Sequence, residues 1–453
     1  MSAVGQFFGG VGFVFDLVRK VMHFIVLALF FLILGASFTG ETPPPVPSGA
    51  ALLLDFDGPL VEQLSGDPVD RAVEELQGAP IAGVLVRQLV RAIDTAAEDD
   101  RISAIVMRLE RLGGGGLTKY QLVADALDRF RASGKSVIVY GDGYTQSHYF
   151  LAAHADEVYL HPSGGVAIDG FGRFRTYYRE AIDKLQIDWN VFKVGEYKSF
   201  VEPYLRDNMS AEDRASSMVW LNQLWDIYVA DVSDARGLSA GVLSAYTENL
   251  AANLDKNGGN VAALAVDAGL VDALKNRDEF RSDMNGRFGP DSTTGTYKHI
   301  PFSDYIVAQG LADPVVRPGT DAVGVIVASG QILDGRQPSG TIGGDSLADL
   351  VRQATADNSL KGLVLVVDSG GGSKFASEVI QRELLGFKAT GRPLIAYMSS
   401  VAASGGYWIS MDADEIWANE ATITGSIGIG GFFPTFQRSL DSLGIHVDGI
   451  GTT

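Results

Sequence analysis

Cysteine is missing from all 453 residues of this sequence. The protein therefore has no thiol nucleophile, no disulfide and no zinc site built on cysteine ligands. Histidine is scarce as well, because only six are present and no two have the HExxH spacing of a catalytic zinc site. We expect a protein that works without a metal or another cofactor.

Basic residues are few compared with acidic ones, with 36 Lys and Arg against 55 Asp and Glu and a net charge of −19. Nucleic-acid binding depends on clustered Lys and Arg that contact phosphates, so this balance argues against a nucleic-acid partner. With 46% hydrophobic and 20% charged residues, the composition is that of a folded globular chain. A chain of this length exceeds one ordinary core, so two domains are expected.

A long apolar run occupies residues 21–38, with the sequence VMHFIVLALFFLILGASF. As a helix it would rise about 27 Å, close to the roughly 30 Å hydrocarbon core of a bilayer. The basic pair Arg19 and Lys20 precedes the run, and positive charge marks the cytoplasmic side of such a segment. These features predict a cytoplasmic N-terminus at 1–20, a transmembrane anchor at 21–38 and export of the remainder.

The segment that follows is rich in proline, with the run PPPVP at residues 43–47. Proline-rich chain is extended and stiff, so we interpret residues 39–50 as a short linker off the membrane. A cleaved signal peptide is the alternative to an anchor, because Gly-Ala-Ser at 35–37 is an imperfect cleavage site. The apolar run is longer than the apolar core of a signal peptide, which favours the anchor.

The chain contains an internal repeat, in which residues 104–140 match residues 362–397 at an offset of 257 or 258. The matched pairs include turn glycines and aromatic residues: Gly113 with Gly370, Gly134 with Gly391, Phe130 with Phe387 and Tyr140 with Tyr397. Further along, HADEVYLHP at 154–162 matches DADEIWANE at 412–420. Self-similarity at a fixed offset predicts a tandem duplication.

The duplication predicts a first repeat domain at 51–315 and a second at 316–453. In each copy two short β-branched strands flank a Gly-rich turn and a helix. The expected strands are Ile105–Leu109 and Val137–Tyr140 in the first copy, and Leu363–Val367 and Leu394–Tyr397 in the second. The expected helices are Leu117–Arg131 and Lys374–Lys388. Such a unit joins parallel strands by a right-handed crossover, so the predicted fold class is α/β, with helical arms at 206–285.

A candidate nucleophile lies at the turn after the second strand of copy two, where Ser404 is followed by two glycines. Glycines let a substrate backbone approach, and free amides beside a serine can bind an oxyanion. On its own this is a weak variant of the G-x-S-x-G turn, and a tight turn capped by serine is the structural alternative. Gly370–Gly372 form a second loop at the same sheet edge. Their copy-one counterpart at 113–116 lacks the Lys-Ser/Thr of a phosphate loop.

A serine nucleophile needs a base, and the residues alone leave two arrangements open. His446, preceded by Asp441, would complete a triad, but the spacing is tight and the fold pattern differs from that of α/β-hydrolases. Lys198, between Tyr197 and Phe200, is the other candidate. A free lysine has a pKa near 10.4, and burial among aromatic side chains could lower that pKa by about 3 units. Two carboxylates nearby in the sequence would oppose this shift if they faced inward.

Three longer runs resemble one family closely: AASGGYWIS at 402–410, TGSIGIGG at 424–431 and VGEYKSFVEPYLRDNMS at 194–210. They are similar to signal peptide peptidase A, or protease IV, in its long two-repeat form. The resemblance implies two tandem crotonase- and Clp-like βαβ repeat domains with helical arms, preceded by one transmembrane helix. It also implies a single-pass protein of the bacterial inner membrane with its catalytic domain in the periplasm.

The same resemblance implies the catalytic roles. Ser404 corresponds to the nucleophile, Lys198 to the general base and Ser426 to the serine that orients the lysine amine. Gly372 and Gly405 correspond to the residues whose amides form the oxyanion hole. The implied substrates are cleaved signal peptides and other apolar peptides. The implied assembly is a homo-oligomer, a tetramer, in contact with inner-membrane lipid.

Two features depart from the family pattern. Residues 369–372 are Ser-Gly-Gly-Gly in place of Ser-Pro-Gly-Gly, which removes the φ restraint of proline and predicts a less pre-organised loop. The chain also ends at Thr453, the counterpart of Gly195, so we expect a C-terminally truncated chain. The alternative function is therefore a catalytically impaired, membrane-tethered assembly subunit. The alternative nucleophile is Ser147, although His148 follows it where glycine is needed.

Overall fold

In the computed structural model the described residues are 19–28, 43–66, 83–291, 294–311 and 320–452. The chain divides into two compact units, Met1–Pro45 and Val46–Thr453. In the first unit residues 19–28 are helical, and the rest of the predicted anchor, residues 29–38, lies outside the described residues. None of the helices formed by the described residues is both long enough and apolar enough to cross a membrane.

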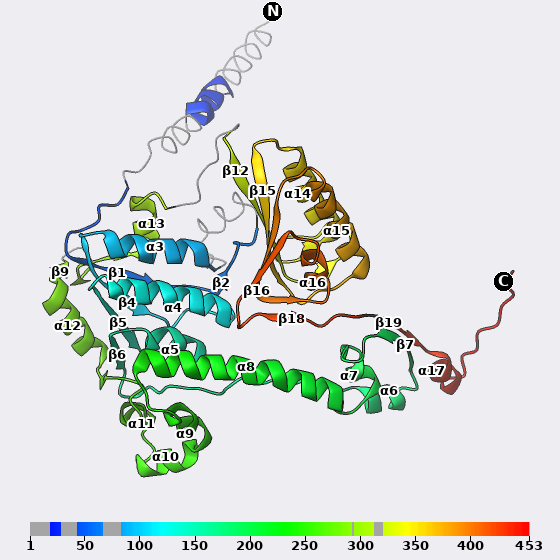
Figure 1. Ribbon diagram of the computed structural model, residues 1–453, viewed down its shortest axis with the longest axis horizontal. Helices are drawn as coiled ribbons and strands as arrows, with labels where there is room; N and C mark the ends of the chain where they lie inside the picture. Colours follow the sequence, from blue (N-terminus) through cyan, green and yellow to red (C-terminus); the bar gives the residue numbers. More distant parts are fainter. Residues whose placement is uncertain (1–18, 29–42, 67–82, 292–293, 312–319, 453) are drawn as a thin grey trace, which may run out of the picture. The chain divides into compact units, whose positions relative to one another are not determined.

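The second unit contains a parallel sheet of six strands in the order β11-β1-β4-β5-β6-β8 (Figure 1). Its strands are β1 (Ala50–Asp55), β4 (Ile102–Arg108), β5 (Ser136–Gly141), β6 (Glu157–Leu160), β8 (Ala273–Leu274) and β11 (His299–Pro301). The Val and Ile side chains of β4 and β5 are almost completely buried. Continuous apolar runs of this kind are typical of parallel strands that are covered on both faces.

Helices cover both faces of this first sheet. They are α3 (Val86–Glu98), α4 (Leu117–Ala132) and α5 (Gln146–Ala153) on one face, and α12 (Arg277–Phe288) on the other. Ile105 and Val137 point toward α3, α4 and α5, whereas neighbouring positions point the opposite way. On that opposite face Phe280 of α12 stacks on Tyr140, with ring centroids 4.7 Å apart.

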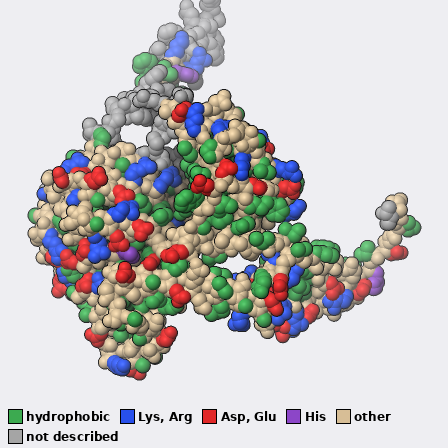
Figure 2. Space-filling model, viewed as in Figure 1, with side chains coloured by type: hydrophobic (Ala, Val, Ile, Leu, Met, Phe, Trp, Pro, Cys, Tyr) green, Lys and Arg blue, Asp and Glu red, His purple; other side chains and the backbone are tan. Residues whose placement is uncertain are grey.

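A second parallel sheet has the order β12-β15-β16-β17, with β18 also beside β16. Its strands are β12 (Ala322–Ser329), β15 (Leu360–Ser369), β16 (Leu394–Ala403), β17 (Glu415–Ala418) and β18 (Ile423–Gly425). The helices that pack on it are α14 (Gly344–Ala356), α15 (Lys374–Lys388) and α16 (Gly405–Ser410). On the other face Val323, Val325 and Trp417 are 60–61% exposed. Figure 2 shows hydrophobic side chains gathered on that side of the sheet, away from α14 and α15.

Two further contacts join the parts that carry the two sheets. The strand β7 (Asp188–Val194) pairs antiparallel with β19 (Ile429–Thr435), so segments far apart in the sequence form one ladder. The long helix α8 (Ala211–Arg236) runs from this ladder back to the first sheet (Figure 1). On its way Gln223 Nε2 donates to the carbonyl of Glu420 at 2.7 Å.

Short elements complete the described chain. The strands are β2 (Leu60–Val61), β3 (Val84–Leu85), β9 (Pro290–Asp291), β10 (Thr296–Tyr297), β13 (Ile332–Leu333) and β14 (Ile342–Gly343). The helices are α6 (Arg179–Lys184), α7 (Glu202–Leu205), α9 (Val242–Glu248), α10 (Leu250–Lys256), α11 (Val261–Asp267), α13 (Phe302–Ala308) and α17 (Gln437–Ser442). The range 206–285, expected to be helical, contains most of α8 to α12.

Predicted and observed elements agree closely within the repeated segments. The helix predicted at Lys374–Lys388 has these bounds as α15, and α4 ends one residue later than predicted. The strands β4 and β15 each begin three residues before the predicted strands, because a strand continues wherever its backbone finds a ladder partner. The predicted α/β class with parallel sheets is confirmed. The predicted domain boundary at 315–316 lies outside the described residues.

Candidate active site

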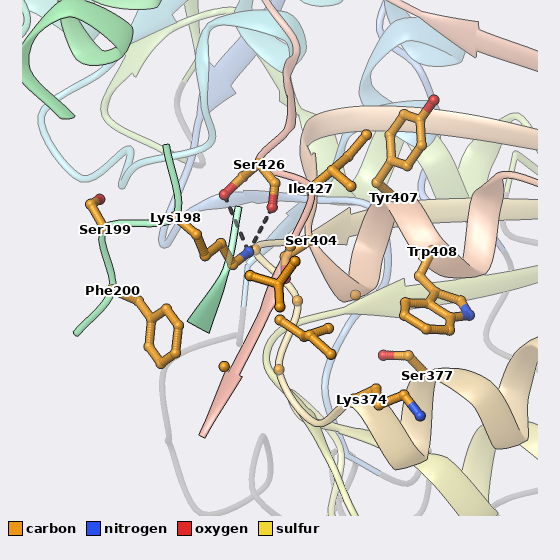
Figure 3. Close-up of a pocket in the computed structure, with 18 of the residues that line it drawn as sticks. Lys198, Ser199, Phe200, Lys374, Ser377, Ser404, Tyr407, Trp408, Ser426 and Ile427 are labelled. Carbon is orange, nitrogen blue, oxygen red and sulfur yellow. Dashed lines mark hydrogen bonds between the residues drawn. The ribbon is translucent and has the colours of Figure 1, made fainter. Parts of the chain in front are cut away.

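A cavity of about 640 Å³ lies where the first half of the second unit (residues 46–311) meets its second half (residues 320–452). The first half contributes the segment around Lys198, and the second half contributes the loops that follow β15, β16 and β18. The residues predicted for the site all line this cavity: Ser404, Lys198, Ser426, Gly372 and Gly405. Figure 3 shows Lys198 with its amine turned toward Ser426 and with Ser404 beside it.

Ser404 stands at the turn between β16 and α16 with φ 54° and ψ −116°. Its N–H donates to the carbonyl of Gly425 at 2.8 Å, and its own carbonyl accepts from the N–H of Trp408 at 2.9 Å. A positive φ costs a non-glycine residue about 1–3 kcal/mol and persists where the surroundings impose it. Within the described ranges the non-glycine residues with positive φ are Gln186, Ser404 and Ser426, so two of the three line the cavity. A strained serine at a strand-to-helix turn is the arrangement that exposes a nucleophilic hydroxyl.

The glycines beside Ser404 are needed for close packing of two loops. A Cβ added to Gly371 would lie 2.4 Å from the nitrogen of Gly405, and one added to Gly406 would lie 2.5 Å from the carbonyl oxygen of Ser369. Gly371 also has φ 93°, a conformation that other residues adopt only under strain. The loop after β15 therefore packs directly against the turn that carries Ser404.

Hydrogen bonds fix the loop at 369–372 although it lacks proline. The N–H of Gly371 donates to Ser369 Oγ at 3.1 Å, and the carbonyl of Gly371 accepts from the N–H of Ile332 at 3.0 Å. These contacts restrain Ser369 and Gly371 on either side of Gly370, the position where the family pattern has proline. Within the described ranges no backbone carbonyl accepts from the amides of Gly372 and Gly405, so both remain available to a bound oxygen.

Lys198 is 9% exposed, and burial lowers the pKa of its amine. Its Nζ donates to the carbonyl of Ser426 at 2.6 Å and lies 3.4 Å from Ser426 Oγ. We expected the rings of Tyr197 and Phe200 to bury the amine, but Tyr197 is 58% exposed. The aliphatic part of the Lys198 side chain instead packs against the backbone of a glycine. A Cβ added to Gly428 would lie 3.4 Å from both Cβ and Cδ of Lys198.

The carboxylates near Lys198 in the sequence do not oppose this shift. Glu196 is exposed, and the buried carboxylate of Glu202 accepts from the N–H and the hydroxyl of Ser210 at 3.1 and 2.5 Å. A third carboxylate, that of Asp213, accepts from the Ser199 hydroxyl at 2.6 Å and from Arg173 at 2.7 Å. Each buried carboxylate therefore has its own donors, and the hydrogen bond from Ser199 also fixes the backbone next to Lys198.

The β7–β19 ladder explains how residues 228 positions apart come together. Val194, at the end of β7, pairs with Ile429, at the start of β19. A turn closed by Lys198 N–H donating to Gly195 O at 3.2 Å follows β7, and Ser426 lies three residues before β19. The turn after one strand and the segment before the other therefore meet at the cavity. No local pattern in the sequence pointed to this antiparallel pairing.

The sequence of this chain is similar to the sequences of several known proteins. Residues 129–287 and 386–453 match the family described as peptidase family S49. Protease 4 of Haemophilus influenzae is 37% identical to this chain over 446 residues, which cover 97% of this chain and 72% of that protein. The chain belongs to peptidase family S49. Protease 4 of Salmonella typhi is 38% identical over 449 residues (96% and 72%), and the chloroplastic serine protease SPPA of Arabidopsis thaliana is 26% identical over 383 residues (83% and 54%).

This S49 member is a serine peptidase, as the sequence resemblance had predicted. The first matched range contains Lys198, and the second contains Ser404 and Ser426. The two ranges of the S49 match thus contribute to the same cavity from opposite sides.

The structure does not bring the alternative residues to the cavity of this S49 peptidase. Ser147 lies inside α5 rather than at a turn, and it is absent from the cavity lining. His446 contacts Asp441 at 3.2 Å, but this pair is 75% and 65% exposed near the end of the described chain. Ser147 is therefore not positioned to act as the nucleophile of this cavity, and the His446–Asp441 pair is not positioned to activate Ser404.

Sequence reasoning missed the apolar wall of the S49 site. Tyr407 and Trp408 on α16, and Met411 directly after this helix, line the cavity together with Ile427 and Ile429. Met411 follows Tyr407 by four residues and Trp408 by three, a spacing that places side chains on one side of a helix, and this is the signal that could have identified them. These side chains give the cavity an apolar wall beside Ser404.

Proposed function

We propose that this S49 peptidase is a membrane-bound endopeptidase that cleaves signal peptides with a Ser404–Lys198 dyad. One observation carries the proposal: a buried lysine from the first half and a strained serine from the second half line one cavity. The carboxylates near Lys198 are either exposed or accept hydrogen bonds from other donors. Burial lowers the pKa of the Lys198 amine. Both features favour the neutral amine that a base requires.

The proposed reaction passes through an acyl-enzyme. Neutral Lys198 accepts the hydroxyl proton of Ser404, and the serine oxygen adds to the peptide carbonyl carbon. The amides of Gly372 and Gly405 donate to the resulting oxyanion. When the C–N bond breaks, the lysine ammonium returns its proton to the leaving amine. Water then attacks the ester by the same route and restores free Ser404, so the sum is hydrolysis of one peptide bond.

Ser426 orients the amine in this scheme. Its carbonyl accepts one N–H of Lys198 at 2.6 Å, and its hydroxyl lies at 3.4 Å. These contacts direct the lysine while leaving its lone pair free for Ser404. The positive φ of Ser426 supports this role, because it aims the carbonyl at the amine from a backbone conformation that the fold imposes.

The apolar character of the site supports the proposed substrates, and the resemblance of the sequence supports both the substrates and the proposed location. The wall formed by Tyr407, Trp408, Ile427 and Ile429 fits the apolar stretches of signal peptides. We propose that residues 21–38 anchor the chain in the inner membrane of a bacterium and that the catalytic halves, two copies of one duplicated unit, lie in the periplasm. A homo-oligomer, a tetramer, would then enclose the site beside the lipid.

Labelling with a fluorophosphonate probe tests the dyad. We expect the purified full chain to be labelled and to cleave an apolar peptide, whereas Ser404→Ala and Lys198→Met lose both properties with unchanged circular dichroism. The matched control is Ser147→Ala, which changes the counterpart serine of the first half and should retain labelling. Labelling that survives Ser404→Ala but disappears in Ser147→Ala would overturn the proposal.

A further inference from the structure

The proposed chemistry leaves one buried lysine, Lys119 on α4, without a role. It is 3% exposed, and its Nζ donates to Gly115 O at 2.9 Å, Asp368 Oδ2 at 2.7 Å and Ser400 Oγ at 2.9 Å. Three acceptors occupy all three N–H bonds of an ammonium group. Acceptors therefore surround the Lys119 amine, and Lys119, unlike Lys198, does not line the cavity. Its charge instead links the first half to two residues of the second half.

Both second-half partners of Lys119 lie just before the loops of the active site. Asp368 immediately precedes the loop 369–372, and Ser400 lies four residues before Ser404. The second carboxylate oxygen of Asp368 accepts from the N–H of Val401 at 3.1 Å, so one side chain connects the ends of β15 and β16. Lys119 thus binds to the two strands that carry the oxyanion loop and the nucleophile.

The connection occurs where the ladder between β15 and β16 is interrupted. Val367 pairs with Met398, and Ser369 pairs with Ala402, so β16 advances four residues while β15 advances two. Residues 399–401 have no partner in β15, although Val401 pairs with Ile423 of β18. A bulge of this kind changes the direction of the chain beside it. The carboxylate of Asp368, which is paired with Lys119, accepts from an N–H in this bulge.

The first half approaches this bulge closely. A Cβ added to Gly116, which has φ 83°, would lie 2.3 Å from Ser400 Oγ, and Thr118 Oγ1 lies 2.8 Å from the same oxygen. The glycines at 113–116 correspond by sequence to the oxyanion loop of the second half. In the structure Gly116, the last of these glycines, lies at the start of α4 and places Lys119 against β16.

We propose that Lys119 is a positioning residue of the active site. Through Asp368 and Ser400 it sets the oxyanion loop and the Ser404 turn relative to each other, although it touches neither the substrate nor the dyad. The inference rests on the proposed function, since it assigns a task to Lys119 only if these two loops perform the chemistry. Removal of the ammonium leaves the largely buried Asp368 carboxylate without its charge partner, and the strand ends separate.

Steady-state kinetics of Lys119→Met with an apolar chromogenic peptide tests this role. We expect kcat to fall about 10- to 100-fold with little change in KM, because a displacement of about 1 Å in a catalytic group costs up to two orders of magnitude in rate. The pH midpoint of kcat/KM should stay that of wild type, since the dyad itself is untouched. A merely structural role would lower the amount of active enzyme and leave kcat per labelled Ser404 unchanged.

The double variant Lys119→Met/Asp368→Asn sharpens the test. It removes both charges while keeping similar shapes, and the loss of a buried ion pair as a whole is often tolerated when the loss of one partner is not. We expect the double variant to recover most of the kcat that Lys119→Met loses. Ser400→Ala, which removes one acceptor, should lower kcat about three- to tenfold and decides the question if Lys119→Met does not fold.

Lys135→Met is the matched control. Lys135 donates to the carbonyls of Ala96 and Asp99 at 2.8 Å and joins elements of the first half away from the cavity. Its loss should leave kcat at the wild-type value. Wild-type kcat in both Lys119→Met and Ser400→Ala, or an equal loss in Lys135→Met, would overturn the inference. If instead Ser404→Ala remains active, the proposed function fails, whatever Lys119→Met does.

Discussion

The same strand-to-helix turn occurs once in each half, and only the turn after β16 contributes its serine to the lining of the site cavity. After β5, Thr145 has ordinary extended backbone and caps α5 by accepting from the N–H of His148 at 3.3 Å, which leaves Ser147 within the helix. After β16, Ser404 takes the cap position itself with a positive φ. A serine at matching places in the sequence therefore has two different structural roles.

The residues that follow each serine account for the difference. His148 Nε2 contacts the carbonyl of Leu112 at 2.8 Å, and the hydroxyl of Tyr149 donates to Leu270 O at 2.6 Å, so side chains fill the turn of the first half. Glycines occupy the corresponding positions of the second half and leave the backbone amides open. One fold thus provides a closed turn for structure and an open turn for chemistry.

The sheets differ in a second way that can be tested by stability. Phe280→Ala removes a 4% exposed ring from the covered face of the first sheet and should lower the free energy of unfolding by about 3–5 kcal/mol. Trp417→Ala on the uncovered face of the second sheet should change it by only about 0.5 kcal/mol. Urea denaturation followed by circular dichroism measures both, and equal losses would mean that the second face is covered in solution.

The glycine loops of the two halves should respond differently to a single methyl group. Gly371→Ala places a Cβ 2.4 Å from the nitrogen of Gly405, so the loop and the Ser404 turn must separate, and kcat should fall about 100-fold. Gly114→Ala in the corresponding loop meets no atom within 4 Å and should change kcat by less than about twofold. Peptide cleavage rates per labelled serine measure this contrast. Similar losses in both variants would contradict the prediction that close packing against the Ser404 turn is what makes Gly371 necessary.

The pH dependence of cleavage should report Lys198. Burial lowers the pKa of this amine from 10.5, and the base must be neutral, so activity appears as the pH rises through the lowered pKa. We expect kcat/KM to rise about tenfold per pH unit on the acid side and to reach a plateau below pH 10.5. Lys198→Arg keeps a positive charge at every accessible pH and should be inactive throughout. Activity that falls as the pH rises through this range would exclude a lysine base.

Ser426→Ala should have the smallest effect. The variant removes the hydroxyl at 3.4 Å from the Lys198 amine but leaves the carbonyl at 2.6 Å, so kcat should fall about three- to tenfold. Ser439→Ala, on α17 outside the cavity lining, is the control and should match wild type. Complete inactivation of Ser426→Ala would show that the hydroxyl takes part in proton transfer.

Local patterns were sufficient for much of the fold. The bounds of α15, the start of α4 and the parallel strands around them follow from β-branched runs, helix periodicity and turn glycines. The Ser404 turn was recognisable for the same reason, because a serine and two glycines at a strand end are contiguous in the chain. The packing around Lys198 could not be recognised from local sequence. Tyr197 is exposed to solvent, and the aliphatic part of Lys198 packs against glycine backbone.

By itself the sequence determined that the chain belongs to an α/β class, because short-range periodicity is a local property. It also identified Ser404 and Lys198 as candidates for the chemistry, because side-chain type is local as well. Only the tertiary structure decided how the two halves cooperate. The pairing of β7 with β19 and the contacts of Lys119 with Asp368 and Ser400 join residues more than 200 positions apart. Such contacts depend on backbone hydrogen bonds and on buried charge. Any strand edge can form backbone hydrogen bonds, so local sequence does not specify which strand β7 pairs with. A buried charge needs a partner of opposite charge, and no local pattern identifies that partner.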